Sequence, residues 1–374
     1  MAAPRGGDEL VVKNRPLPFS YFPVTRDSRR YGLFDLLFAG RPWTVMQGAV
    51  ITQVSAAQRA EALAFLEQAQ DFYQSASDRL ATKPLLTYYA FLNLGKALLR
   101  VLGYPGDLEM AVHGLAEERV TPGADLDNFA VVAKKGYGGR LSVYSEVLDR
   151  LGFARPAHNH SYPITELVPQ VVVGHRLWRE ATGRTERFVG IEKIQMVQDS
   201  GAKELWLRLY VQRGDLDRYS ITHKRLIEEG GLADEFREVD TALTGENGDW
   251  MCLEQKAALA YTGRPTDVLL DLVEPMKHKL WRIITTMPER GYRKYYIHLT
   301  PPAEQNRLPQ IASLWCLIFY FGSVVRYRPQ DFDAMTAGKY GAFVSEFIGA
   351  QSEQLLYMMA SEMCRREVAK PAVI

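Results

Sequence analysis

The sequence predicts an α+β protein in which a mostly helical bundle carries an inserted antiparallel β-sheet. Three observations lead to this fold class. Apolar residues recur at helical spacing before about residue 103 and again after about residue 253, whereas residues 187–212 are rich in β-branched and aromatic side chains. The chain has 374 residues, 47% of them apolar, which is enough to build a sizeable core in two or more domains.

These patterns divide the chain into four predicted segments. Residues 1–52 are polar at first, then aromatic-rich and punctuated by glycine and proline, so we expect an irregular N-terminal extension. Residues 53–130 and 253–374 should supply the N-terminal and C-terminal helical parts of the bundle. Residues 131–252 should form the β-rich insertion.

Two helices are expected first, over residues 55–76 and 85–102. Ser55 followed by Gln58 is typical of a capping box at the start of the first helix. Pro84 opens the second helix at a position where a missing N–H is harmless, and Gly103 ends it. The second helix is apolar nearly all round, which predicts that it is the buried centre of the bundle.

A narrow polar stripe follows this otherwise apolar helix. Tyr89, Asn93, Lys96 and Arg100 are four, three and four residues apart, so they share one helical face. A buried amide or ammonium without a partner costs on the order of 1–3 kcal/mol or more, so the stripe needs partners. One interpretation is a polar groove bordered by Tyr89, Asn93 and Lys96. The other is an internal hydrogen-bond ladder, with Lys96 reaching the surface.

The middle of the chain changes to the two-residue period of strands. In residues 204–212, leucine or valine alternates with Trp206, Arg208, Tyr210 and Gln212, which predicts a half-buried strand. Residues 187–198 should form a preceding strand, joined to it by a turn at 199–201. Residues 293–299 are expected to form another strand.

Helices are expected to resume at residues 254–261 and 265–287 and to continue at 309–325 and 341–368. Residues 311–325 contain no charge, but a membrane span needs about 20 apolar residues, so we expect a buried core helix there.

Composition narrows the class of protein and its compartment. A net charge of +1 excludes a globally basic nucleic-acid binder, although not a local basic patch. The chain has three cysteines, Cys252, Cys316 and Cys364, and no two of them form a CxxC pair, so neither a zinc knuckle nor a redox dithiol is indicated. So few cysteines fit a reducing compartment. Residues 1–14 lack the apolar core of a signal peptide. We therefore expect a cytoplasmic protein with no membrane partner, no metal and no cofactor.

An arginine precedes a histidine by five positions at three places in the chain. In ribonucleases that work without a metal, such a pair on one helical face can activate the 2′-hydroxyl and stabilise charge on the phosphate. Arg218 and His223 are the best placed, next to helical-looking residues 224–229. The pair at 155 and 160 includes a proline, and the pair at 293 and 298 lies in a β-like run. His158 and His160 could begin a metal site, although a solvated loop is the simpler interpretation.

Two further features could contact nucleic acid. A glycine-rich loop at 134–140 could cradle phosphate and stack a base, or could be a flexible turn. On the predicted strand, Arg208 lies between Trp206 and Tyr210 and could bind single-stranded nucleic acid, or pack beneath a helix. The candidate side chains of the loop are Lys134, Lys135, Tyr137 and Arg140.

Two parts of the chain resemble the signature of the YaaC-like bacterial proteins. Residues 84–98, PLLTYYAFLNLGKAL, are similar to that family's PLL-YY-x-x-LN-x-x-K-A helix, and His113-Gly114-Leu115 is similar to the HGL element that follows it. Residues 314–329, which end in Arg326-Tyr327-Arg328-Pro329, resemble the family's apolar helix closing in RYRP. The order of these matches implies homology from about residue 55 to about residue 360.

The Tyr-Tyr-Ala helix followed by a His-Gly element is also similar to helices of the HEPN superfamily. Those helical domains occur in toxin–antitoxin and antiviral systems, often as ribonucleases or RNA-binding partners. The similarity implies a HEPN-like bundle and adds His113 to Arg218 and His223 as a candidate catalytic residue. Arg326 and Arg328 could contact phosphate or a partner, or could complement the dipole of their helix.

These features together predict a component of a prokaryotic antiviral-defence or stress system that binds RNA or single-stranded nucleic acid. If it is an enzyme, it should be a metal-independent nuclease acting on RNA. The alternative is a non-catalytic interaction subunit that forms a homo-oligomer or holds a partner protein of the defence system. The near-neutral charge and the many aromatic residues support this alternative. A small-molecule enzyme that uses the helix groove as a pocket is a third possibility.

Overall fold

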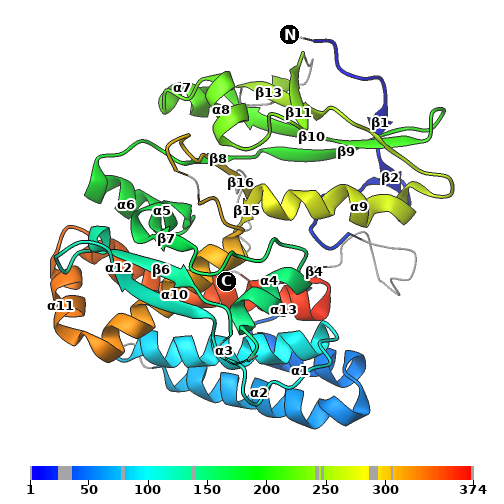
Figure 1. The fold of residues 1–374 in the computed structure, drawn as a ribbon. Coiled ribbons are helices and arrows are strands. Elements are labelled where there is room, and N and C mark those ends of the chain that lie inside the picture. The colour runs from blue at the N-terminus through cyan, green and yellow to red at the C-terminus, as the bar shows by residue number, and fades with distance from the viewer. Residues whose placement is uncertain are drawn as a thin grey trace. The chain divides into compact units, whose positions relative to one another are not determined.

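The computed structural model describes residues 2–23, 36–76, 81–136, 138, 140–240, 244–245, 248–285, 294–304 and 306–371 (Figure 1). The chain divides into two compact units. Unit 1 consists of Met1–Leu37, Thr185–Arg307 and Pro371–Ile374, and unit 2 consists of Phe38–Arg184 and Leu308–Lys370. Both contain helices and antiparallel sheets, which confirms a mixed α/β architecture.

Unit 2 is built around the buried helix α3 (Lys83–Val101). Helices on several sides cover α3, and 12 of its 19 residues are buried, which confirms the predicted central helix. A Cβ on Gly95 would lie 2.5 Å from Cη2 of Trp315, so this glycine allows α3 and α10 to pack closely. The helices that contact α3 are α1 (Pro42–Gln53), α2 (Ala56–Ser75), α4 (Val143–Arg150), α10 (Gln310–Tyr327) and α13 (Ser352–Cys364).

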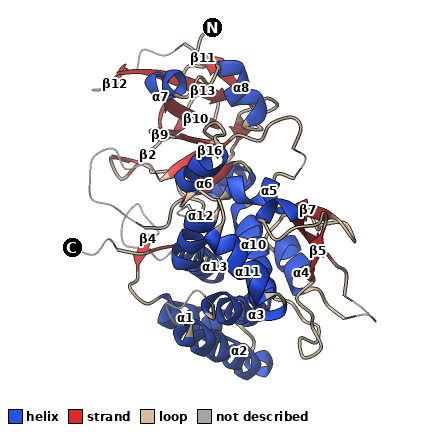
Figure 2. Ribbon diagram, turned by 90° about the vertical axis from the view of Figure 1, so that its left-hand side faces the viewer, coloured by secondary structure: helices blue, strands red, loops and turns tan. Residues whose placement is uncertain are grey.

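The rest of unit 2 adds a small sheet and short helices to this bundle (Figure 2). The sheet has the order β5 (Leu115–Arg119), β6 (Phe129–Ala133), β7 (Ser161–Pro163), with Leu115 opposite Ala133. The remaining elements are α5 (Ile164–Leu167), α6 (His175–Thr182), α11 (Pro329–Ala337), α12 (Gly341–Glu346), two 3-10 turns (Leu126–Asn128 and Val168–Gln170), a π-helical turn (Phe347–Gln351) and β17 (Glu367–Ala369). β4 (Leu36–Phe38) spans the boundary between the units.

Unit 1 contains the larger sheet, in the order β1 (Asp8–Glu9), β9 (Lys193–Asp199), β10 (Glu204–Gln212), β13 (Gly248–Gln255), β11 (Phe236–Val239). Asp199 lies opposite Glu204, which confirms the hairpin predicted around the turn at 199–201. A second sheet has the order β15 (Leu280–Arg282), β16 (Tyr295–His298), β8 (Phe188–Gly190). The smaller elements are β2 (Val11–Val12), β3 (Arg15–Pro16), β12 (Thr244–Gly245), β14 (Leu259–Ala260), α7 (Arg213–Arg218), α8 (His223–Glu229) and α9 (Leu269–Val273).

The central strand β10 is covered on both faces. Its leucines and Val211 belong to the main core of unit 1. On the opposite face, Trp206 and Tyr210 have exposed fractions of 0% and 1%, so the prediction of a half-buried strand is wrong. The reason is that residues 2–9 of the same unit cross this second face.

Several predicted elements differ from the structure. Residues 254–261 form the end of β13 and β14 rather than a helix, because these residues pair with β10 and β11. Residues 265–285 form 3-10 turns, the short helix α9 and β15 instead of one long helix. Residues 187–198 form two strands in different sheets, β8 and β9.

The boundaries of the units also differ from the four predicted segments. Residues 1–52 contain α1, in which Trp43, Met46 and Val50 are buried at helical spacing. Residues 131–252 divide between the units, because β6 and β7 pack with the bundle whereas β8 to β11 join the sheets of unit 1. None of the helices within the described ranges is long and apolar enough to cross a membrane.

Candidate functional site

The stretches that resemble the YaaC-like signature meet within unit 2, and they are residues 84–98, 113–115 and 314–329. Tyr88 and Tyr89 lie in the first turns of α3, His113 precedes β5, and Arg326 and Tyr327 end α10. A Cβ on Gly322 would lie 2.8 Å from the Cβ of Tyr88, so the start of α3 and the end of α10 are in close contact. We call Tyr88, Tyr89, His113, Arg326 and Tyr327 the Tyr–His–Arg cluster.

Ring contacts join the inner members of the cluster. The rings of Tyr88 and His113 meet edge to face with centroids 6.0 Å apart, and His113 stacks on Phe319 of α10 at 5.2 Å. The Tyr88 ring also contacts Phe319 at 5.4 Å and Tyr89 at 5.2 Å. Burial raises the pKa of Tyr88, so its hydroxyl stays protonated at neutral pH.

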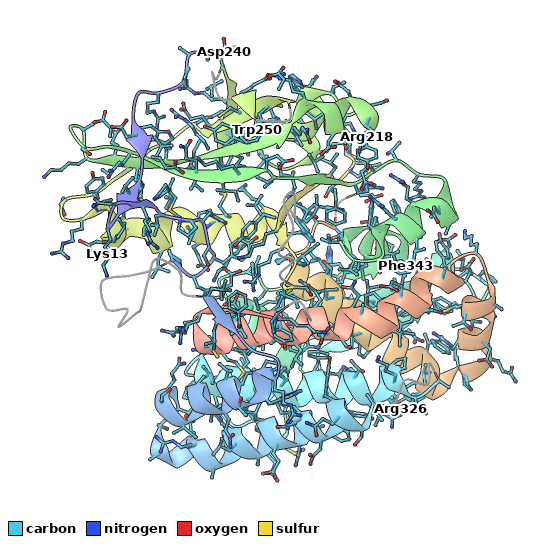
Figure 3. All side chains as sticks on the ribbon, turned by 180° about the vertical axis from the view of Figure 1, so that it is seen from behind. Lys13, Arg218, Asp240, Trp250, Arg326 and Phe343 are labelled. Carbon is cyan, nitrogen blue, oxygen red and sulfur yellow. The ribbon has the colours of Figure 1, made fainter. Side chains whose placement is uncertain are left out.

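The outer members of the cluster present a cation beside an exposed ring. Nη1 of Arg326 donates a hydrogen bond to the hydroxyl of Tyr89 at 2.5 Å, and its guanidinium lies 4.9 Å from the ring of Tyr327. Tyr327 has an exposed fraction of 66%, the largest of the exposed hydrophobic side chains in the described part of the chain. Arg326 is also exposed, at the edge of unit 2 (Figure 3). A ligand can therefore reach both side chains.

His113 is held as a neutral ring in one orientation. The backbone N–H of Leu115 donates to its Nδ1 at 3.2 Å, which places the ring proton on Nε2. Burial lowers the pKa of His113. The chemistry open to this ring at neutral pH is therefore hydrogen-bond donation from Nε2.

The turn at Gly114 fixes the position of His113. Gly114 has a φ of +84°, and a Cβ there would lie 1.8 Å from Oγ of Ser142, the N-cap residue of α4. The carbonyl of Gly114 accepts from the N–H of Lys134 at 2.8 Å, and the carbonyl of His113 accepts from the N–H of Tyr144 at 3.1 Å. The histidine is thus clamped between the small sheet and the start of α4.

The glycine-rich loop at residues 134–140, which follows β6, contacts the loop that contains His158 and Asn159. Nζ of Lys134 donates to Oδ1 of Asn159 at 2.8 Å, and the N–H of Lys135 donates to Nδ1 of His158 at 3.1 Å. Lys135 and Arg140 are exposed. Tyr137, the predicted stacking residue of this loop, lies outside the described residues.

The polar stripe of α3 faces α2. Nζ of Lys96 lies 5.0 Å from the ring of Phe65, and Tyr89 packs on Phe72 at 5.7 Å. Arg100 is buried and pairs with Glu61 at 2.6 Å, while its Nη1 donates to two carbonyls of the following loop. Burial lowers the pKa of Lys96. These contacts favour the internal ladder, and they place Asn93 on the same half-buried face.

Arg218 and His223 lie on separate helices, α7 and α8. Arg218, which Figure 3 labels, is 70% exposed. It pairs with Asp215 at 3.8 Å. Nδ1 of His223 lies 3.1 Å from Oε2 of Glu238, and its Nε2 lies 3.2 Å from Nη1 of Arg213. Because arginine only donates, Nε2 of His223 is the acceptor in its contact with Arg213.

Two other predicted arginines, Arg208 and Arg328, carry charges that neighbouring carboxylates balance. Arg208 pairs with the buried Glu254 at 2.9 Å. Arg328 pairs with Glu117 and with Asp331, and its guanidinium lies 4.4 Å from the ring of Phe129. Arg326 differs from both, since its guanidinium contacts two tyrosine side chains of the cluster.

His298 is fully buried between the rings of Phe188 and Trp281, each with its centroid 4.9 Å away. Its predicted partner Arg293 lies outside the described residues. Among the residues that the structure describes, no group of three or more His, Cys, Asp or Glu side chains is placed to hold a metal ion.

The fold and the cluster define a mixed α/β protein of two units, with a helical unit that presents an aromatic and cationic surface. The family model described as YaaC-like Protein matches residues 40–363, most of the chain. The protein therefore belongs to the YaaC-like family, as its sequence motifs predict. No curated protein and no solved structure matches the chain.

Proposed function

We propose that this YaaC-like protein is a cytoplasmic component of a prokaryotic defence or stress system that binds single-stranded RNA through the Tyr–His–Arg cluster. A HEPN-like relationship of the helical unit is part of this proposal. The observation that carries the proposal is the contact between α3 and the exposed Arg326 of α10, beside the exposed ring of Tyr327. His113 packs against the same two helices.

The chemistry of the cluster suits a nucleotide. A guanidinium can pair with phosphate oxygens, and a tyrosine ring can stack on any base, which contributes about 1–3 kcal/mol per stacked base. Tyr89 fixes one nitrogen of Arg326 and leaves the rest of the guanidinium at the surface. Less side-chain entropy is therefore lost on binding.

Binding suits this geometry better than cleavage does. A ribonuclease without a metal needs a base to take the proton of the 2′-hydroxyl. Nδ1 of His113 already accepts a hydrogen bond, and Nε2 carries the proton. The neutral His113 can therefore donate to a phosphate, but it is poorly arranged to act as that base.

The binding proposal predicts that Arg326→Gln and Tyr327→Ala each weaken the affinity for a fluorescein-labelled 20-nucleotide oligo(U) RNA by about tenfold, because one loses the phosphate contact and the other the stacking contact. Fluorescence anisotropy measures the affinity. Arg218→Gln is the matched control, since it removes another exposed arginine, from unit 1, and it should bind like the wild type. Unchanged affinity in both cluster variants would contradict the proposed site.

The hypothesis that the protein also cleaves RNA is tested with the same oligonucleotide. We expect the wild-type protein to leave it intact. If cleavage occurs and His113→Ala alone abolishes it, His113 becomes the catalytic residue. Loss only in His223→Ala or His298→Ala would instead move the chemistry to unit 1. Cleavage that survives all three changes would remove His113, His223 and His298 from the mechanism.

The competing function is a non-catalytic interaction subunit. The exposed ring of Tyr327 also suits burial by a partner protein or by a second copy of the chain. Light scattering separates the two functions. An oligomer that ignores RNA and dissociates on Tyr327→Ala supports the interaction subunit.

A further inference from the structure

Residues 2–9 cross the face of the large sheet in unit 1, from one edge to the other (Figure 1, dark blue). Ala2 bridges to Val239 of β11, and its carbonyl accepts from the N–H of Asp240 at 2.9 Å. At the other edge, β1 pairs with β9. Between these ends the segment passes over β13 and β10. We call residues 2–7 the strap.

Arg5 is the anchor of the strap. Its guanidinium lies 4.9 Å from the ring of Trp206, and Nη2 donates to the carbonyl of Lys256 at 2.6 Å. Its backbone N–H donates to both carboxylate oxygens of Glu254, at 3.1 and 3.0 Å. Its carbonyl accepts from Nη2 of Arg208. Side chain and backbone of this one residue are thus both recognised.

The other residues of the strap are small and exposed. A Cβ on Gly7 would lie 2.5 Å from Cη2 of Trp206 and 2.9 Å from the carbonyl oxygen of Gln198, and Gly7 has a φ of +155°. A Cβ on Gly6 would meet nothing within 4 Å. The surface therefore accepts an arginine followed, two positions later, by a glycine.

We propose that the surface beneath the strap is a binding site for an extended arginine–glycine peptide, which the chain's own residues 2–7 occupy in the resting state and vacate on release. The site is in unit 1 and is independent of the proposed RNA function. Its ligand is a peptide because both the backbone and the guanidinium of Arg5 are bound.

The site is built from groups that stay in place when the strap leaves. Trp206 and Arg208 belong to β10, and Glu254 belongs to β13, at the centre of the sheet. Glu254 keeps its pairs with Arg208 and Arg237, both at 2.9 Å, and remains an acceptor for an incoming N–H. Segments with few buried side chains open at the lowest free energies in a folded protein.

The test uses the chain of residues 1–374 and a labelled peptide with the sequence of residues 2–9. Arg5→Ala should release the strap and bind the peptide saturably, at least tenfold more tightly than the wild type does. A peptide carrying the same arginine-to-alanine change should not bind. Gly7→Ala should act like Arg5→Ala by a steric route, and the matched control Gly6→Ala should behave like the wild type.

Hydrogen exchange of residues 2–9 reports release independently. The proposal is overturned if Arg5→Ala and Gly7→Ala both release the strap, by faster exchange, yet neither takes up the peptide. It is also overturned if neither change speeds exchange, because Arg5 and Gly7 would then not hold the strap. Gly7→Ala keeps the test informative if Arg5→Ala does not fold.

Discussion

Glu254→Gln is expected to destabilise the large sheet of unit 1 by about 3–5 kcal/mol, the usual cost of removing one member of a buried ion pair. The carboxylate is fully buried and accepts from Arg208 at 2.9 Å and from Arg237 at 2.9 Å. Glutamine keeps the shape but removes the negative charge between two guanidinium groups and points an amide toward one of them. Hydrogen exchange of β10 and β13 in increasing urea measures the loss within unit 1.

The same variant has a distinct pH signature. Burial acts to raise the pKa of Glu254, but the hydrogen bonds from Arg237 and Arg208 outweigh it and hold the pKa below its usual value of 4.5. The stabilisation by this carboxylate is therefore complete above that value and is lost as the pH falls through the lower pKa of the folded protein. The difference between wild type and Glu254→Gln should be constant from about pH 6 to 8 and shrink in acid.

Glu228→Gln serves as the matched control for this prediction. Glu228 is 58% exposed and pairs with Lys224 at 3.8 Å on the surface of α8. Such surface pairs contribute about 0.3–0.5 kcal/mol. A cost for Glu254→Gln as small as this would mean that the buried network does not hold the sheet together.

Short stretches of sequence predict those helices and hairpins whose ends and apolar faces are set by neighbouring residues. α3 is predicted at 85–102 and found at Lys83–Val101, because a proline and a glycine mark its ends and its apolar surface is continuous. The hairpin of β9 and β10 also follows from alternation and a turn. In both cases neighbouring residues carry the whole signal.

Tertiary pairing overrides propensity in residues 254–261. Glu254, Gln255 and Lys256 favour helices in isolation, yet Glu254 lies opposite Arg208 on β10 and opposite Arg237 on β11. The buried charge network keeps this segment extended. Its partners are 46 and 17 residues away, so no local window contains the signal.

The candidate site, too, depends on contacts between residues that are far apart in the sequence. His113 and Arg326 stand out separately in the sequence, but the contacts of His113 with Tyr88 and Phe319, and of Arg326 with Tyr89, emerge only when α3 and α10 pack. Tyr327 is missed, although its place between Arg326 and Arg328 in the RYRP motif could have drawn attention to it. The sequence does not predict the strap, because an arginine followed by two glycines is too short a pattern to indicate a contact with a distant sheet.

Gly114→Ala is expected to destabilise unit 2 by about 2–6 kcal/mol and to displace His113. A non-glycine residue in a left-handed conformation costs about 1–3 kcal/mol, and overpacking adds about 1–3 kcal/mol. The overpacking arises because the new methyl group would lie 1.8 Å from Oγ of Ser142. Urea unfolding followed by hydrogen exchange of α3 and α4 measures the change.

Two further variants separate these contributions. Gly103 has a φ of +76°, and a methyl group on its Cα would meet nothing within 4 Å, so Gly103→Ala should show the conformational cost alone. Ser142→Ala in the Gly114→Ala background should recover part of the stability, because it removes the crowded hydroxyl while also losing the N-cap of α4. Equal costs at Gly114 and Gly103 would show that the turn is not clamped against α4. His113 would then owe its orientation to its stacking on Phe319 rather than to the turn that follows it.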